Sequence, residues 1–190
     1  GNRDLKIGTI IAIGMVCVFV WAGGEPLLRT FVPGLFAAWL IFVWMYVKKV
    51  SLADGQYLYP FYFSVLAWQF VHFGEEFMTG FRVQFPELLD ASPYSSELFI
   101  GINMASYFGF TLAFILAFAA GLRFFIVPVL FFVVYGAIGN AISHTFWVIS
   151  HEAYFPGFFS AQMYWVLGLL VLGKLIGSCR KAVVFSSGFA

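Results

Sequence analysis

Charged residues are rare in this chain. Only 10% of its 190 residues are charged, whereas a soluble domain carries about 25%. Apolar side chains make up 62% of the residues and aromatic side chains 22%, with 26 Phe among them. A water-soluble domain of this size could not bury so much apolar surface in one core. The composition excludes a soluble, disordered or nucleic-acid-binding protein and predicts a multi-pass membrane protein with one domain, residues 1–190.

Cysteine is nearly as scarce, because the chain has only 2. Cys17 lies within an apolar run and Cys179 near the basic C-terminal end, so no disulfide framework is expected. The first apolar run follows Arg3 and Lys6, as a signal peptide would. It is followed by Gly23–Glu25 rather than by a typical cleavage site, and further apolar runs come after it. We therefore expect it to remain as a membrane anchor.

Long apolar runs occupy most of the chain. A membrane-spanning helix needs about 20 mostly apolar residues. Six runs approach that length, at Ile7–Ala22, Phe31–Val47, Tyr57–Phe77, Leu98–Ala120, Phe124–Ile149 and Ala161–Ile176. They are continuous rather than alternating with a period of two, which indicates helices. The predicted fold class is all-α, a polytopic bundle of about six transmembrane helices.

The basic residues divide unevenly between the two sides that six spans would define. Eight of the ten fall on the side of the termini, and only Arg29 and Arg82 fall on the other. Because basic loops stay in the cytoplasm, both termini are predicted to be cytoplasmic. The expected location is the bacterial inner (plasma) membrane, with the lipid bilayer as partner. Seven of the nine acidic residues and all three His then fall toward the outer face.

Ionisable residues are rare inside membrane spans and are therefore candidates for function. The third predicted span carries Gln69, His72, Glu75 and Glu76 in the stretch WQFVHFGEEF. At about 100° per residue, Gln69, His72 and Glu76 share one helix face, and Glu75 lies at its edge. Burying two carboxylates gains little stability, so this group predicts a functional site.

A second polar group lies on the fifth predicted span, in the stretch GNAISHTFWVISHE. Asn140 and His144 are four residues apart and share a face, on which His151 would also lie if the helix continued. Asn103, on the fourth predicted span, would reach a similar depth. For Asn103, Ser143 and Gln69, a plain role in interhelical hydrogen bonding is favoured over a functional one.

Three chemistries use these residue types. Two His and two Glu on facing helices match the ligands of metal sites in helix bundles. Zinc is favoured, with one Glu left over as general base, and a two-metal site bridged by both Glu is an alternative. Without a metal, a buried Glu and His could donate and accept protons. The third chemistry is a proton or ion relay, as in a small transporter.

Two connections are predicted to lie near this site. Tyr154–Gly157, with the sequence Tyr-Phe-Pro-Gly, is typical of a turn and would shape the mouth of the site. The connection from Met78 to Glu97 is the longest, and is either a binding segment or a solvated linker. Within it, Ser92-Pro93 predicts the start of the next helix.

Three short motifs occur in order along the chain. His72–Glu76 fits H-x-x-E-E, Asn140–His144 fits N-x-x-x-H, and Tyr154–Gly157 fits Y-x-P-G. Together they resemble the HXXEE family of integral membrane proteins, over roughly Tyr57 to Gly157. That resemblance supports the choice of residues but implies no reaction, because the family has no assigned function.

The functional hypothesis is a membrane-embedded enzyme, a metal-dependent hydrolase or an acid–base isomerase, that acts on a lipid or another hydrophobic molecule. The alternatives are a proton- or ion-coupled transporter and a lipid-binding protein without catalysis. A transporter is less favoured, since no internal repeat is found and the polar groups gather toward one side. The expected catalytic residues are His72, Glu75, Glu76 and His144, the expected metal ligands are these four and His151, and the expected substrate- or cofactor-binding residues are Asn103, Asn140 and Tyr154.

Overall fold

The computed structural model of the chain describes residues 2–50 and 55–187. Within these ranges every regular element is helical and no strand occurs. The all-α fold class predicted from the apolar runs is therefore confirmed.

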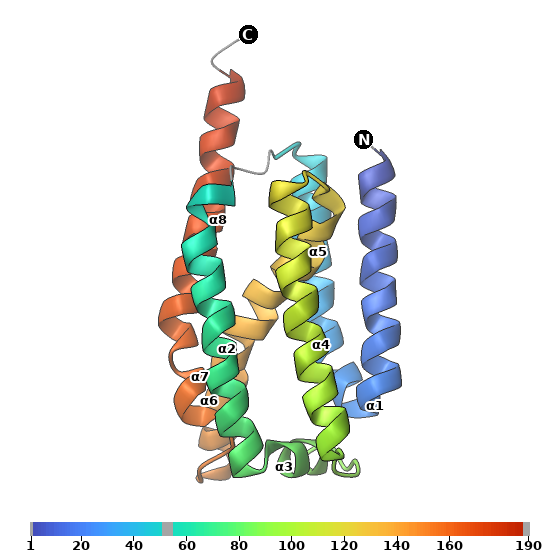
Figure 1. The fold of residues 1–190 in the computed structure, drawn as a ribbon, viewed down its shortest axis with the longest axis vertical. Helices are drawn as coiled ribbons and strands as arrows, with labels where there is room; N and C mark the ends of the chain where they lie inside the picture. The colour runs from blue at the N-terminus through green and yellow to red at the C-terminus, as the bar shows by residue number, and fades with distance from the viewer. Residues whose placement is uncertain (1, 51–54, 188–190) are drawn as a thin grey trace.

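The first helix, α1 (Asn2–Val47), folds back on itself. Gly24 has φ 61° and ψ −145°, a conformation that only glycine adopts readily, and the helix reverses direction there. The two arms run antiparallel (Figure 1), and Trp39 Nε1 of the second arm donates to Thr9 Oγ1 of the first at 3.1 Å. The two arms correspond to the first and second predicted spans.

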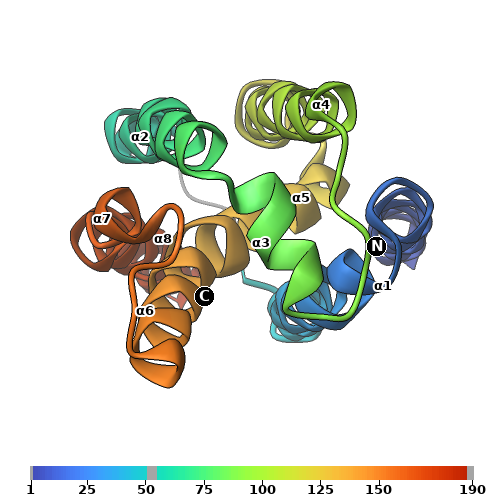
Figure 2. The same cartoon turned by 90° about the horizontal axis from the view of Figure 1, so that it is seen from below.

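The remaining helices run alternately down and up the bundle. The start of α1 and the end of α8 lie at the same end, and α3 lies across the opposite end (Figures 1 and 2). Two of the elements, η2 and η4, are π-helical and continuous with their neighbours. Segment η2 extends α4, and η4 joins α5 to α6 in one long rod. The elements are η1 (Gly55–Tyr57), α2 (Tyr59–Thr79), α3 (Phe81–Glu87), α4 (Ser96–Phe114), η2 (Ile115–Ala119), η3 (Arg123–Phe125), α5 (Ile126–Phe131), η4 (Phe132–Gly139), α6 (Asn140–His151), α7 (Phe158–Ala161) and α8 (Tyr164–Ser187).

Much of the outer surface is apolar, as a bilayer requires. Trp21 on α1 is 86% exposed and Phe108 on α4 is 69% exposed. Helix α2 is 21 residues long, but its polar side chains lower its hydropathy. In the described part of the chain, four helical segments are long and apolar enough to cross a membrane: Arg3–Val47, Ser96–Ala119, Arg123–His151 and Phe158–Cys179. The chain is therefore a helical membrane protein, and six crossings stay a prediction.

At the end of the bundle near the termini, the interior is filled by aromatic side chains. The ring of Tyr62 on α2 stacks on Phe114 with 4.3 Å between centroids and contacts Phe132 edge-on at 5.3 Å. Its hydroxyl donates to the carbonyl oxygen of Phe110 at 3.1 Å. This packing holds α2, α4 and η4 together and leaves the hydroxyl satisfied.

The predicted helix start at Ser92-Pro93 is wrong by one turn. Helix α4 begins at Ser96, and Ser95 is its N-cap, accepting a hydrogen bond from Leu98 N at 3.1 Å. A backbone hydrogen bond explains the later start of the helix. Tyr94 N donates to Arg82 O at 2.9 Å, and this keeps the chain before α4 extended. The connection between α2 and α4 is therefore partly helical and folds over the end of the bundle as α3.

Candidate metal site

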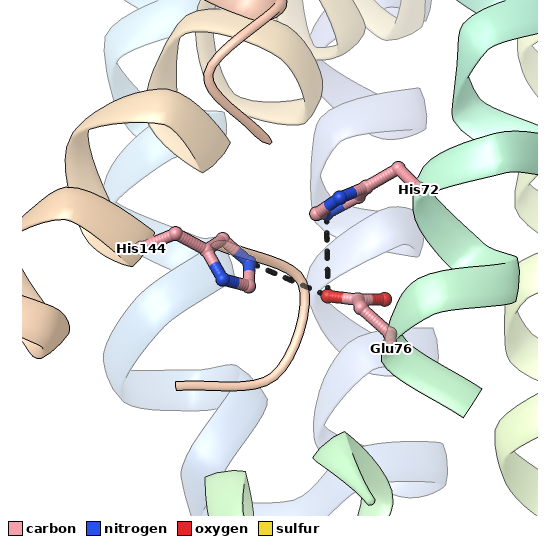
Figure 3. A group of neighbouring side chains, drawn as sticks. All are labelled: His72, Glu76 and His144. Carbon is pink, nitrogen blue, oxygen red and sulfur yellow. Dashed lines mark ion pairs between the residues drawn. The ribbon is translucent and has the colours of Figure 1, made fainter. Parts of the chain in front are cut away.

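Three side chains converge at a buried point between α2 and α6 (Figure 3). Glu76 Oε1 lies 3.3 Å from His72 Nε2 and 3.4 Å from His144 Nε2. The three candidate ligand atoms are all within 4.8 Å of one another. Both His are 0% exposed and Glu76 is 6% exposed. We call these three residues the His–Glu–His group.

Three of the four ring nitrogens of this group have no hydrogen bond to a described residue. Among the described residues, His72 Nε2 and both ring nitrogens of His144 are buried without a hydrogen-bond partner, so neither contact with Glu76 is an N–H···O bond. A buried polar atom left unpaired costs about 1–3 kcal/mol. Such atoms converging on one carboxylate oxygen indicate a place for a cation.

Two of the three ligand separations are those of a tetrahedral metal site. With bonds of about 2.0–2.1 Å, neighbouring ligand atoms of a tetrahedral zinc site lie about 3.3–3.4 Å apart. The two His–Glu separations match this value. Two imidazole nitrogens and one carboxylate oxygen are also ligands that zinc accepts. The His–Glu–His group could therefore hold a metal ion.

Local helix geometry places each member of the group. His72 and Glu76 are four residues apart on α2, so they lie on one face, and Gln69 is buried on the same face. His144 lies on α6, directly after the π-helical η4. A π-helical segment carries extra residues per turn and rotates the helix that continues from it, and such segments are frequent at functional sites.

Glu75 lies apart from the His–Glu–His group and binds the segment between α6 and α8. Its Oε1 accepts from Tyr154 OH at 2.8 Å and from Phe159 N at 3.1 Å. Its Oε2 accepts from Ser160 N at 2.7 Å and from the Ser160 hydroxyl. Partial burial and the neighbouring Glu75 carboxylate raise the pKa of Tyr154. Glu75 therefore anchors residues 154–160 over the site.

Ser160 connects Glu75 to His72. The Ser160 Oγ lies 2.9 Å from His72 Nδ1. Because this hydroxyl donates its proton to Glu75, its oxygen must accept from His72 Nδ1–H. Nδ1 then carries the ring proton, and Nε2 presents a lone pair to Glu76 Oε1. An outer hydrogen bond of this kind is what fixes the tautomer of a metal-binding His.

His144 has a different environment. Its ring packs against Phe81 of α3 and Trp147 of α6, with centroids 5.5 and 5.1 Å away. Aromatic packing rather than a hydrogen bond therefore orients this ring.

The predicted turn at Tyr154–Gly157 covers the His–Glu–His group. Gly157 has φ 86°, in the left-handed region that favours glycine. A Cβ at this position would lie 2.7 Å from His144 Cε1, 2.8 Å from Glu76 Cγ and 3.0 Å from His72 Cε1. Only glycine lets the backbone approach all three side chains this closely.

A cavity of about 90 Å³ lies beside the His–Glu–His group. It is walled by aromatic side chains of α1, α3, α4 and η4. Of the three group members only Glu76 lines it, as far as the described residues show. Its other polar lining residues are Gln69, Tyr94, Asn103, Ser106, Tyr107, Tyr135, Asn140 and Ser143.

The other residues named from the sequence lie farther out. Asn140 lines the cavity, and its amide donates to Gly136 O of its own helix at 2.9 Å. Asn103 also lines it, and its Oδ1 accepts from Tyr107 OH at 3.0 Å. His151 is exposed, with Nδ1 2.9 Å from Trp147 O. Among described residues, the candidate ligand group includes neither His151 nor Glu75.

Ser160 and Tyr164 are site residues that the sequence reasoning missed. Ser160 binds His72, and Tyr164 OH donates to Gln69 Oε1 next to it. Tyr164 also packs its ring edge-on against His72, with 5.4 Å between centroids. In the sequence, the one feature that could have pointed to Ser160 and Tyr164 is that they closely follow the Pro-Gly pair of the predicted turn.

The fold and the site define an all-α membrane protein with a buried His–Glu–His group that could bind a metal. Comparison with models of known families, with characterised proteins and with solved structures gives no match. Membership of the HXXEE family therefore stays a prediction from the three motifs.

Proposed function

We propose that this protein is a membrane-embedded, metal-dependent enzyme that acts on a lipid or another hydrophobic molecule. The metal, zinc in this proposal, would bind His72 Nε2, Glu76 Oε1 and His144 Nε2. One observation carries the proposal: His72 Nε2 lies 3.3 Å from a carboxylate oxygen of Glu76 and has no hydrogen-bond partner among the described residues. A cation bound between them would give both atoms a partner and would also satisfy His144 Nε2.

Three protein ligands suit a catalytic rather than a structural zinc site, because they leave one coordination position open. A zinc ion there polarises a bound oxygen and lowers the pKa of bound water. Asn140 and Ser143 line the adjacent cavity and would orient the polar part of the substrate. Glu75 was a candidate general base, but its two oxygens accept four hydrogen bonds. We assign it to holding the covering segment.

The site would lie near the outer face of the membrane. This orientation follows from the eight basic residues that six crossings place on the side of the termini, which would be cytoplasmic. The membrane would be the bacterial inner membrane, and the bilayer would supply the substrate. A single cysteine at Ala153, which is exposed beside the covering segment, tests the orientation. An impermeant maleimide should label it from outside the cell, and labelling only from the cytoplasm would reverse the topology.

A metal-free acid–base isomerase is the second candidate. Its support is that Glu76 belongs both to the His–Glu–His group and to the cavity lining. In this version Glu76 exchanges a proton with the substrate, and the two imidazole rings lie against its carboxyl group.

Metal analysis of detergent-purified protein decides between these candidates. The metalloenzyme should carry about one ion per chain, and two ions would indicate the two-metal version. Joint replacement His72→Ala and His144→Ala should remove the metal. Metal-free protein that still turns over a lipid would establish the acid–base candidate, and Glu76-dependent proton-coupled uptake into liposomes would establish a transporter.

A further inference from the structure

The cavity beside Glu76 is too small for a whole hydrophobic substrate. Its volume of about 90 Å³ is well below the roughly 300–1,000 Å³ of small-molecule pockets. It can therefore accept a polar group of a few heavy atoms. The apolar part of a substrate needs another place.

A larger apolar groove lies on the neighbouring surface, between the first arm of α1 and α4. Its volume is about 560 Å³, within the range of small-molecule sites. It extends along α4 from Glu97 to Ala113, which corresponds to about 24 Å of helix. The α4 side is formed by Gly101, Ala105 and Gly109, and a Cβ on either glycine would meet no described atom within 4 Å.

The groove and the cavity are adjacent. Leu27 of α1 lines both, and so do Ile102, Ser106 and Phe110 of α4. These four side chains form the wall between the two spaces. Movement of Ile102 or Phe110 to another rotamer would join the groove to the cavity, and Ser106 offers a small hydroxyl at that point.

The shape of the groove indicates what fills it. Its lining follows α4 for about 24 Å, and Glu97 is the one charged side chain among the described lining residues. An elongated apolar surface of this kind suits an extended hydrocarbon chain. Both walls belong to helices apolar enough to cross a membrane, and in Figure 2 they stand next to each other at the periphery of the bundle. The groove therefore opens to lipid.

We propose that the groove binds the hydrocarbon chain of a single-chain amphiphile, whose small polar head passes between Leu27 and Ser106 into the cavity and reaches Glu76. The substrate would then enter sideways from the bilayer rather than from water. The identity of this molecule as a substrate rests on the proposed function, whereas its binding in the groove does not.

Photolabelling of the purified protein in lipid nanodiscs tests the groove. The probe is a long-chain fatty acid with a diazirine midway along its chain. We expect labelling of α4 on the side of Gly101 and Ala105, competed by excess unlabelled fatty acid. Ala105→Phe, which fills the groove, should lower the competed labelling at least fivefold. Ala119→Phe is the matched control, because Ala119 is exposed on η2 outside the groove, and it should leave labelling unchanged.

Two further outcomes separate this inference from its rivals. The joint His72→Ala and His144→Ala variant should label normally. If this variant keeps its metal as well as its labelling, the proposed function alone is wrong. The stripe Gly101, Ala105 and Gly109 also fits a helix contact between two copies. If Ala105→Cys cross-links two chains in the membrane and the probe is not competed from α4, the groove is an interface between copies and the lipid proposal is wrong.

Discussion

Tyr62 and His72 lie on the same helix, ten residues apart, and both are almost fully buried. The hydroxyl of Tyr62 reaches the carbonyl oxygen of Phe110, and its ring stacks on Phe114. His72 has one ring nitrogen bound to Ser160, while the other has no hydrogen-bond partner among the described residues. One end of α2 is a completed core, and the other end is built around polar atoms that remain unpaired.

The difference has an energetic meaning. The described part of the site contains three such unpaired ring nitrogens, each costing about 1–3 kcal/mol. A domain is stable by only about 5–15 kcal/mol in total. A bound cation would offset a cost of this size, so the proposed metalloenzyme should be less stable without its ion.

Removing both imidazoles should have the largest effect. The joint His72→Ala and His144→Ala variant is expected to lower bound metal from about one ion per chain to less than about 0.1. Elemental analysis of the purified protein measures this. Tyr62→Phe, at the completed end of α2, should keep its full metal content. Equal loss in both variants would show that the core as a whole, not the His–Glu–His group, retains the ion.

Disconnecting His72 from Glu75 should have the next largest effect. Ser160→Ala removes the hydrogen bond to Nδ1, and loss of such an outer partner weakens metal binding about 10–100-fold. Competition with a chelator measures the affinity, and the visible spectrum of the cobalt-loaded protein should shift. Ser160→Thr keeps the hydroxyl and should restore both readouts. Failure of threonine to rescue would mean that Ser160 acts only by its size.

Adding one methyl group at Gly157 should have a smaller effect on metal binding. Gly157→Ala meets three site side chains and an unfavourable φ, which together cost about 1–3 kcal/mol. We expect about tenfold weaker metal binding, measured by the same competition. Gly173→Ala, on an exposed part of α8 with open space around it, is the control and should bind metal normally.

The smallest effect is expected at the completed end of α2. Tyr62→Phe loses one hydrogen bond and leaves the carbonyl of Phe110 without that donor. The expected loss of stability is about 0.5–1.5 kcal/mol, measured by unfolding in mixed micelles of increasing SDS content. Addition of metal should raise the unfolding midpoint of this variant as much as that of the wild type. A smaller increase would show that the two ends of α2 are coupled.

Local periodicity explains what could be predicted from the sequence. Spacing on α2 places Gln69, His72 and Glu76 on one face and Glu75 at its edge, and the structure buries the first three. A Pro-Gly pair after α6 predicts the turn, which the left-handed Gly157 forms. Both features depend only on residues within a few positions of one another.

Contacts between distant segments explain what could not be predicted. Ser160 lies 88 residues from His72, and no short pattern relates them. The choice of Ser95 over Ser92 as N-cap depends on hydrogen bonds between Arg82 and Tyr94. The groove exists only because the first arm of α1 stands beside α4, and no single segment contains it.

Two adjacent residues of α2 have opposite tasks, and this affects how fast an ion can exchange. Glu76 faces the ion position, while Glu75 ties residues 154–160 over it through four hydrogen bonds. In the proposed metalloenzyme, an ion that leaves past Gly157 must first displace residues 154–160, so its release on that side would wait until the Glu75 contacts break. Retention of the metal would then be a matter of lifetime, set in part by the carboxylate that does not touch it.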